Sequence, residues 1–89
     1  MLKIETTGQF ERDLKQAKKR RKDLSKLKAV LLLLADGREL PAKYKNHKLS
    51  GVYKACWDLH IEPDWLLLYR VDGGIVTLIR TGTHADLFK

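Results

Sequence analysis

Two apolar runs in the last third of the chain are separated by a turn signal, and this pattern restricts the fold more than any other. The runs cover residues 65–71 and 75–81, and Asp72-Gly73-Gly74 lies between them. Glycine permits the backbone angles that a tight hairpin turn requires. We therefore predict two antiparallel strands, with Gly82 breaking the second and residues 84–88 forming a short tail of about one helical turn.

A third strand is predicted before this hairpin, because the chain alternates with a period of two from Val52 to His60. One face of this strand is polar and is expected to be open; it carries Val52, Lys54, Cys56, Asp58 and His60. The other face is apolar and is expected to lie against helices; it carries Tyr53, Ala55, Trp57 and Leu59. Residues 61–64 turn the chain into the next strand.

The first half of the chain predicts a short strand at residues 2–5 and then two helices. Thr6 or Thr7 can cap the first helix, which is expected to run to about Lys22. The second helix is expected to begin at Asp23 or Ser25 and to end at Asp36-Gly37, with glycine tolerating a left-handed conformation. Its predicted buried face carries Leu27, Val30, Leu31 and Leu34, widened by Leu32 and Leu33.

The order β-α-α-β-β-β predicts an α+β fold in one domain, residues 1–89. We expect a small, mainly antiparallel sheet with a two-helix hairpin packed on one face, the first helix basic and outermost and the second more buried. Residues 38–51 show no period and include Pro41, so they are expected to form a loop. His47 makes this loop a candidate for function.

Charge is concentrated on the first helix and its surroundings. The chain has 89 residues and a formal net charge of +7, and residues 11–28 contribute +6 of it. A basic face of this density predicts a phosphate backbone or an acidic protein as partner. A solubilising helix surface is the alternative explanation.

Targeting and redox signals are sparse. The N-terminal residues lack the apolar core of a secretory signal, and the longest apolar run, residues 29–35, is too short to cross a bilayer. The single cysteine, Cys56, excludes an intrachain disulfide and a cysteine-based zinc site, and it is expected to be buried. The expected location is the cytoplasm, without membrane association.

Histidines and their neighbours are the candidates for chemistry. Histidine titrates near neutrality, so one copy can act as a base and another as an acid. Cleavage of RNA by its own 2′-hydroxyl needs such a pair together with a cation for the charge on phosphorus, and it needs no metal. The candidate set is His47, His60, Asp64, Arg80 and His84. We expect His60, Asp64, Arg80 and His84 to gather at one end of the sheet.

Other readings of these residues stay open. Any histidine can be an inert surface residue, and Asp64 beside Pro63 can be a turn residue. Arg80 can form a structural pair with Asp58 or Glu62. A zinc site made of the three histidines is disfavoured because their spacings match no compact ligand motif and the surroundings are positive. Trp57 and Trp65 fall on the predicted core face, whereas Phe88 in the tail can stack on a base.

Three segments together resemble a known toxin family. These are YKNHKLSG at residues 44–51, WDLHIEPDWLLLY at residues 57–69 and RTGTHADLF at residues 80–88. They are similar to the YafQ-like branch of the RelE/ParE superfamily of toxins from bacterial type II toxin–antitoxin systems. The basic hairpin at residues 7–28 is similar to the same family, so the resemblance covers nearly the whole chain.

The resemblance implies a RelE-like fold and a ribosome-dependent mRNA endoribonuclease. Such toxins cut mRNA in the ribosomal A site, often at adenine-rich codons, and leave a 2′,3′-cyclic phosphate and a 5′-hydroxyl, without a cofactor. The implied partners are the ribosome, mRNA and a cognate antitoxin, with which the toxin forms a heterotetramer that binds operator DNA through the antitoxin. The competing hypotheses are a noncatalytic RNA- or ribosome-binding domain and a ribosome-independent ribonuclease.

The resemblance carries the family's functional positions onto His47, His60, Asp64, Arg80, His84 and Phe88. The roles of these residues are a hypothesis based on their position and chemistry. His84 would be the general acid, and His60 supported by Asp64, or alternatively His47, would accept the proton of the 2′-hydroxyl. Arg80 would stabilise the charge on phosphorus, and Phe88 would position a base. The basic helix would contact ribosomal RNA through Lys15, Lys18, Lys19, Arg20, Arg21 and Lys22.

Overall fold

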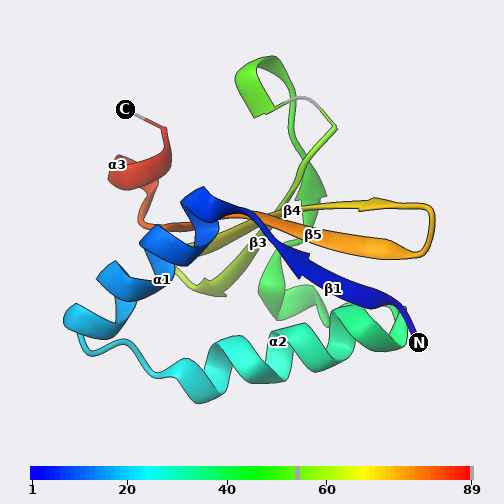
Figure 1. The fold of residues 1–89 in the computed structure, drawn as a ribbon, viewed down its shortest axis with the longest axis horizontal. Helices are drawn as coiled ribbons and strands as arrows, with labels where there is room; N and C mark the ends of the chain where they lie inside the picture. The colour runs from blue at the N-terminus through cyan, green and yellow to red at the C-terminus, as the bar shows by residue number, and fades with distance from the viewer. Residues whose placement is uncertain (54, 89) are drawn as a thin grey trace.

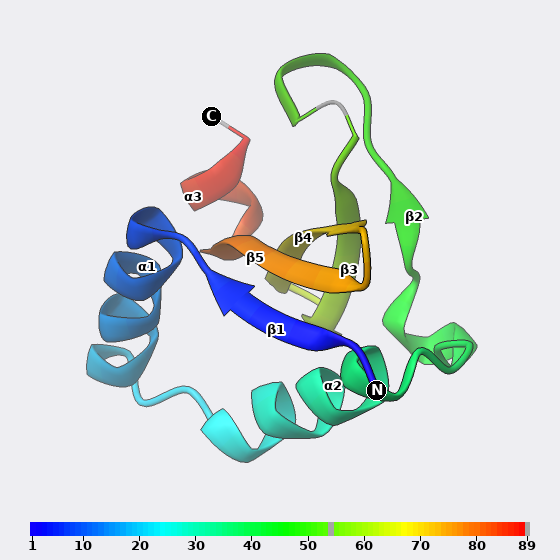
Figure 2. The same cartoon turned by 45° about the vertical axis from the view of Figure 1, so that its right-hand side comes forward.

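A five-stranded, mainly antiparallel sheet with helices on one face forms the molecule (Figures 1 and 2). The structure is a computed structural model, and it describes residues 1–53 and 55–88. The strands are β1 (Lys3–Thr6), β2 (His47–Lys48), β3 (Trp57–Glu62), β4 (Trp65–Asp72) and β5 (Ile75–Gly82). Their order is β1-β5-β4-β3-β2, in which only the β1–β5 pair is parallel. The α+β fold predicted from the sequence is therefore confirmed.

The predicted hairpin is formed by β4 and β5. Gly73 and Gly74 both have positive φ angles, 56° and 78°, which explains why glycine stands at each position of the turn. The pairing of β4 with β5 shifts its register between Leu68 and Tyr69. On β5, the shift lies just after Leu78, where the pairing with β1 ends. Beyond Leu78, β5 has no pairing with β1, so its last residues form an edge of the sheet.

The predicted start of the third strand, at Val52, is wrong. Residues Gly51–Tyr53 form a short 3₁₀ helix, Ala55 has a φ of 70°, and β3 begins only at Trp57. A residue in the left-handed region ends an extended strand, and alternation of side chains does not reveal it. The expected placements of the Val52 side chain and of Lys54 lie outside the described residues. The loop before β3 also contains a 3₁₀ helix, Ala42–Tyr44, and the strand β2, neither of which was predicted.

Two long helices cover one face of the sheet, α1 (Gly8–Lys19) and α2 (Leu24–Asp36). The Thr7 side chain accepts a hydrogen bond from the Phe10 amide at 3.0 Å and so caps α1. Gly37, with a φ of 67°, ends α2 in the predicted left-handed conformation. The first helix ends at Lys19, three residues before the predicted Lys22. It is not an outer layer, because Phe10 and Ala17 pack into the core directly.

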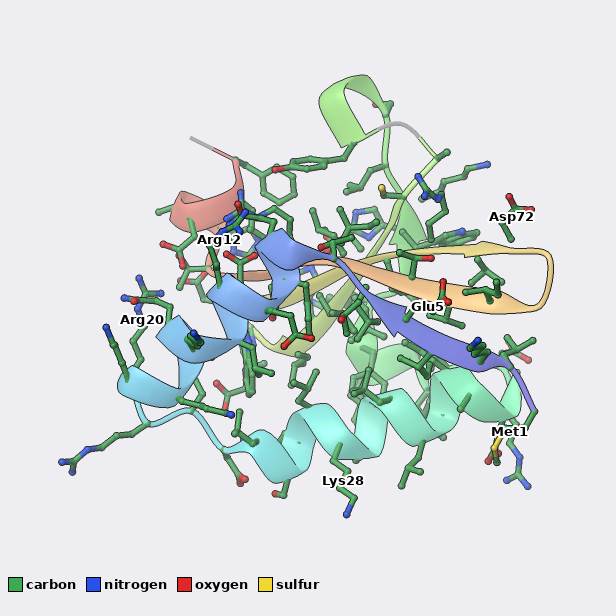
Figure 3. The ribbon with its side chains drawn as sticks, in the orientation of Figure 1. Met1, Glu5, Arg12, Arg20, Lys28 and Asp72 are labelled. Carbon is green, nitrogen blue, oxygen red and sulfur yellow. The ribbon has the colours of Figure 1, made fainter. Side chains whose placement is uncertain are left out.

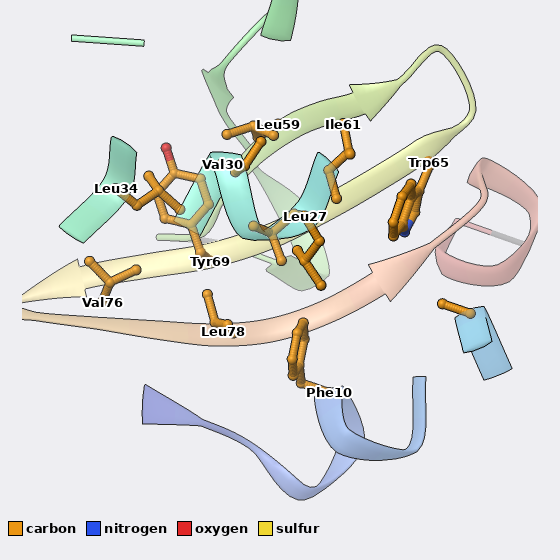
Figure 4. Packing of buried hydrophobic residues seen from close by; sticks show 12 residues of the cluster. Phe10, Leu27, Val30, Leu34, Leu59, Ile61, Trp65, Tyr69, Val76 and Leu78 are labelled. Atoms are coloured by element: carbon orange, nitrogen blue, oxygen red, sulfur yellow. The ribbon is translucent and has the colours of Figure 1, made fainter. Parts of the chain in front are cut away.

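The main core lies between these helices and the sheet (Figure 4). Trp65 is 1% exposed and Trp57 packs against the same cluster, so both tryptophans lie on the predicted core face. Leu32 is 57% exposed, however, and its predicted contribution to the buried face is wrong. No helix in the described part of the chain combines the length and apolarity needed to cross a membrane.

The opposite face of the sheet is not the open polar surface that alternation predicted. A smaller apolar cluster of Leu66, Leu68 and Leu87 lies there, with Leu49, Tyr53 and Ile79 packed against it. Leu87 belongs to α3 (His84–Leu87), the predicted helical turn of the tail. Asp58 and Cys56 are both buried, which corrects the prediction for Asp58 and agrees with that for Cys56. This second cluster supports the residues of the candidate active site.

Candidate active site

The three histidines come from three different elements and meet along one side of the sheet. His47 lies in β2, His60 in β3 and His84 at the start of α3. The ring centroids of His47 and His60 are 6.4 Å apart, and those of His60 and His84 are 5.6 Å apart. Residues separated by up to 37 positions in sequence thus form one row of imidazoles. A row of this kind provides both a proton acceptor and a proton donor within the reach of one phosphodiester.

Asp58 joins two of these imidazoles. Its Oδ2 atom lies 3.5 Å from Nε2 of His47 and 3.5 Å from Nε2 of His60. Its Oδ1 atom is buried and accepts no hydrogen bond from the described residues. One buried carboxylate therefore lies between two imidazoles that come from neighbouring strands. Asp58 was not among the predicted site residues, although Asp58 and His60 stand two positions apart on one strand face, which is the signal that could have identified it.

The His47 ring is oriented from its other side. Its Nδ1 atom lies 2.9 Å from the carbonyl oxygen of Lys45, and a carbonyl can only accept. The Nδ1–H of His47 therefore donates to this carbonyl, which fixes the orientation of the ring with Nε2 on the side of Asp58. Lys45 has a φ of 46°, so a strained backbone position directs this carbonyl.

His84 and Asp64 form a second histidine–carboxylate pair. Asp64 Oδ1 accepts hydrogen bonds from the backbone N–H of His84 at 2.8 Å and from its Nδ1 at 2.5 Å. These two bonds, the backbone one first, lower the pKa of Asp64 below its usual range. The predicted support of His60 by Asp64 is therefore wrong, since the register of β4 and the turn before α3 bring Asp64 to His84. Among the described residues, no hydrogen bond engages the Nε2 atom of His84.

Arg80 is held by the first helix. Its Nε and Nη2 atoms donate to Asp13 at 2.9 and 3.0 Å, and the backbone N–H of Thr81 donates to the same carboxylate at 3.1 Å. The hydrogen bond to Asp13 raises the pKa of Arg80. Asp58 and Glu62, the two structural partners considered from the sequence, do not pair with it among the described residues. Arg80 thus fixes β5 to α1. Leu68 pairs with Asp58 on one side and with Arg80 on the other, so Arg80 lies on the sheet face that carries Asp58. The expected gathering at one end of the sheet is seen for His60, Asp64 and His84.

Phe88 extends the row of imidazoles on the far side of His84. Phe88 is 43% exposed. The centroid of its ring lies 5.8 Å from the ring centroid of Tyr53, in an edge-to-face arrangement, and 6.5 Å from the ring centroid of His84. The backbone N–H of Phe88 donates to the carbonyl of His84 at 2.8 Å. An exposed aromatic ring at this point can stack on a base whose phosphate lies at the histidines.

The basic residues along and just after α1 divide into two groups. Arg20, labelled in Figure 3, is paired with Asp86 at 2.6 Å, and Lys22 is paired with Glu62 at 3.2 Å. The Lys22 ammonium also lies 5.7 Å from the centroid of the Trp65 ring. Within the described residues, no carboxylate is at ion-pair distance from the remaining four, which are Lys15, Lys18, Lys19 and Arg21.

The same histidines and carboxylates bear on metal binding. In residues 1–53 and 55–88, no group of three or more His, Cys, Asp or Glu side chains has the arrangement of a metal site. The histidine–carboxylate pairs are nevertheless potential donors. The chemistry available from the described side chains alone is proton transfer and stabilisation of negative charge.

A mixed sheet in the order β1-β5-β4-β3-β2, two helices on one face and histidine–carboxylate pairs on the other define a small RelE-like toxin domain. The model of the family described as "Bacterial toxin of type II toxin-antitoxin system, YafQ" matches residues 2–89. The chain therefore belongs to the YafQ family of bacterial toxins.

Individual relatives agree with this assignment. The mRNA interferase toxin YafQ of Escherichia coli K12 is 48% identical over 86 residues, which are 96% of this chain and 94% of the relative. The crystal structure of the E. coli DinJ–YafQ complex contains a chain with a TM-score of 0.92 and 46% identity, each chain being covered completely. A metal-bound toxin from Helicobacter pylori matches with a TM-score of 0.92 and 40% identity, covering 99% of this chain and 100% of the other.

Proposed function

We propose that this toxin is an endoribonuclease that cuts mRNA on the ribosome. The observation that carries the proposal is the row of His47, His60 and His84, with Asp58 between the first two and Asp64 beside His84. Such a row supplies the general acid and the general base that are required when a 2′-hydroxyl attacks the neighbouring phosphate. The name of the E. coli relative, an mRNA interferase, supports the same reaction class.

In the proposed mechanism, the 2′-hydroxyl loses its proton to His47 or His60 as its oxygen attacks phosphorus. His84 gives a proton from Nε2 to the departing 5′-oxygen, and the P–O5′ bond breaks. The products are a 2′,3′-cyclic phosphate and a 5′-hydroxyl. Asp64 stabilises the imidazolium form of His84 through Nδ1. No metal takes part.

Two further side chains complete the proposed site. Arg80 contributes a positive charge near the reacting phosphate, and its bidentate contact with Asp13 limits its movement. Phe88 stacks on a base of the substrate, which its exposure permits. Lys15, Lys18, Lys19 and Arg21 contact ribosomal RNA. Their exposure and the net charge of +7 support this role.

The proposed cellular context follows from the family. A cognate antitoxin binds the toxin in a heterotetramer and blocks the site, and operator DNA is bound only by the antitoxin half. The DinJ–YafQ complex of E. coli supports an antitoxin partner. The place of action is the cytoplasm, where translating ribosomes are found.

The test is primer extension on a defined mRNA, with and without translating ribosomes, using wild-type protein and His84→Gln. We expect discrete in-frame cuts that need ribosomes and disappear in the variant. Lys3→Gln, on the distant strand β1, is the control and should cut normally. Cuts without ribosomes would indicate a free ribonuclease.

A noncatalytic RNA- or ribosome-binding domain is the alternative. It predicts that wild-type protein binds ribosomes and produces no cuts under any of these conditions. Mapping of the 3′ ends of the fragments decides the proposed chemistry separately. A cyclic phosphate supports attack by the 2′-hydroxyl, whereas a plain 3′-hydroxyl with a 5′-phosphate contradicts it.

A further inference from the structure

Asp86 holds together the single helical turn that carries His84. The Asp86 amide donates to Thr83 Oγ1 at 3.1 Å, and Asp86 Oδ2 accepts from the Thr83 amide at 3.0 Å, which makes a reciprocal capping box. A four-residue helix has almost no stability of its own. The position of His84 and Phe88 therefore depends on the contacts that fix this turn.

The same carboxylate is bound from the other side by Arg20 of the α1 C-terminus. The guanidinium donates from Nη1 to Oδ2 at 2.6 Å and from Nη2 to Oδ1 at 3.3 Å. The two residues are 66 positions apart in sequence. The hydrogen bond from Arg20 keeps the pKa of Asp86 well below its usual range. Two-point binding of this kind fixes orientation as well as distance.

Space for this contact comes from Gly82. A Cβ atom at Gly82 would lie 2.9 Å from Oδ2 of Asp86 and 3.0 Å from its Cβ, so any side chain would displace the carboxylate. The ion pair borders a cleft of about 270 Å³ between α1 and the end of β5. On its other side, α3 is anchored by Leu87 in the second apolar cluster. Between α1 and α3, the Arg20–Asp86 pair is thus the specific connection.

We propose that Asp86 is a positioning residue of the active site and that Arg20 acts through it. The pair sets the orientation of α3 and hence the placement of His84 Nε2 and of the Phe88 ring. Arg20 is then not one of the residues that contact ribosomal RNA, unlike its neighbours Lys19 and Arg21. This inference rests on the proposed function, because it assigns a role in that reaction.

The experiment compares Asp86→Asn, Arg20→Gln and the double variant, with Arg12→Gln as the matched control on the same helix. Asparagine keeps an oxygen that can accept from the Thr83 amide but removes the charge that binds Arg20. We expect each single variant to lower kcat about ten- to a hundredfold with little change in KM, as misplacement of a catalytic group does. The double variant should be no slower than either single one, since both remove one interaction. Arg12 is exposed and donates to Gln9, so Arg12→Gln should leave kcat and KM unchanged.

A direct contact of Arg20 with RNA would instead change KM, and in opposite directions for the two single variants. If Arg20 contacted RNA, Arg20→Gln would raise KM, and Asp86→Asn would lower KM by releasing Arg20 and removing a negative charge. That pattern, or additive effects in the double variant, would overturn the proposal. Arg20→Lys, which keeps the charge but not the two-point contact, should regain only part of the lost kcat.

A second readout does not depend on cleavage. NMR of the imidazole protons in the free toxin should show the His84 signals displaced in both Asp86→Asn and Arg20→Gln, and the His47 signals unchanged. Signals of His84 that match wild type in both variants would overturn the coupling even if the protein is an active nuclease. If wild-type protein cuts no RNA but the His84 signals move as expected, the proposed function fails and the connection between Arg20 and α3 stands.

Discussion

Replacement of Asp13 by alanine should destabilise the fold far more than the loss of a surface charge. Asp13 accepts two hydrogen bonds from Arg80, one from the Thr81 amide and one from Gln9. The Asp13 side chain is only 10% exposed, whereas that of Arg80 is 24% exposed. Hydrogen bonds to a charged group contribute about 1.5–3 kcal/mol, and an unpaired buried donor costs about 1–3 kcal/mol.

The expected loss in the free energy of unfolding is about 2–3 kcal/mol, since water at the partly exposed Arg80 recovers some of the total. For a domain of this size, that corresponds to a fall in Tm of roughly 10–20 °C. Urea and thermal unfolding followed by circular dichroism measure it. Asp36→Ala is the control, because Asp36 and Arg38 are 3.9 Å apart and both exposed, and it should change stability by about 0.5 kcal/mol or less.

The pH dependence gives an independent check. Burial raises the pKa of Asp13, but hydrogen bonds from Arg80, Gln9 and Thr81 outweigh it, and the pKa is lowered overall. A group whose folded pKa is depressed contributes stability above its unfolded pKa and loses it as the pH falls. The difference between wild type and Asp13→Ala should therefore narrow below about pH 4. A difference at neutral pH no larger than that of Asp36→Ala would refute the structural role assigned to the Asp13–Arg80 contact.

Two further outcomes are expected for the site and the basic helix. Asp58→Asn should slow single-turnover cleavage at least about tenfold without weakening RNA binding, because His47 and His60 lose their shared carboxylate. Equal cleavage rates of the variant and the wild type would mean that the two histidines act independently of Asp58. The triple variant Lys15→Gln, Lys18→Gln, Lys19→Gln should weaken ribosome binding and flatten its dependence on salt by about 2–3 in the logarithmic slope. An unchanged slope, measured by titration at several salt concentrations, would remove this helix face from the interface.

Much of the fold can be predicted from the sequence because the signals that specify it are local. The glycine pair at residues 73 and 74 and the alternation on either side specify the β4–β5 hairpin, and Thr7 and Gly37 mark helix ends through contacts within a few residues. The start of β3 escaped prediction because it depends on a left-handed Ala55, which no propensity favours. The exposure of Leu32 likewise depends on how α2 is rotated against the sheet.

The sequence selects three histidines that the structure brings together, but it does not show which carboxylate lies beside each of them. His47, His60 and His84 were selected by residue type, which the sequence displays directly. Which carboxylate meets which histidine depends on strand register and on the turn before α3, so Asp64 was assigned to His60 and Asp58 was overlooked. The partner of Arg80 lies 67 positions away on α1, beyond the reach of any local pattern.

The parallel pairing of β1 with β5 also bears on when the toxin becomes active. The Thr7 hydroxyl donates to the carbonyl of Ile79, 72 positions later, so the N-terminal strand has no partner until β5 has been synthesised. Contacts of such long range form late in folding. His84 and Asp86 follow β5 directly, so the row of imidazoles is assembled only after both β5 and α3 have been synthesised.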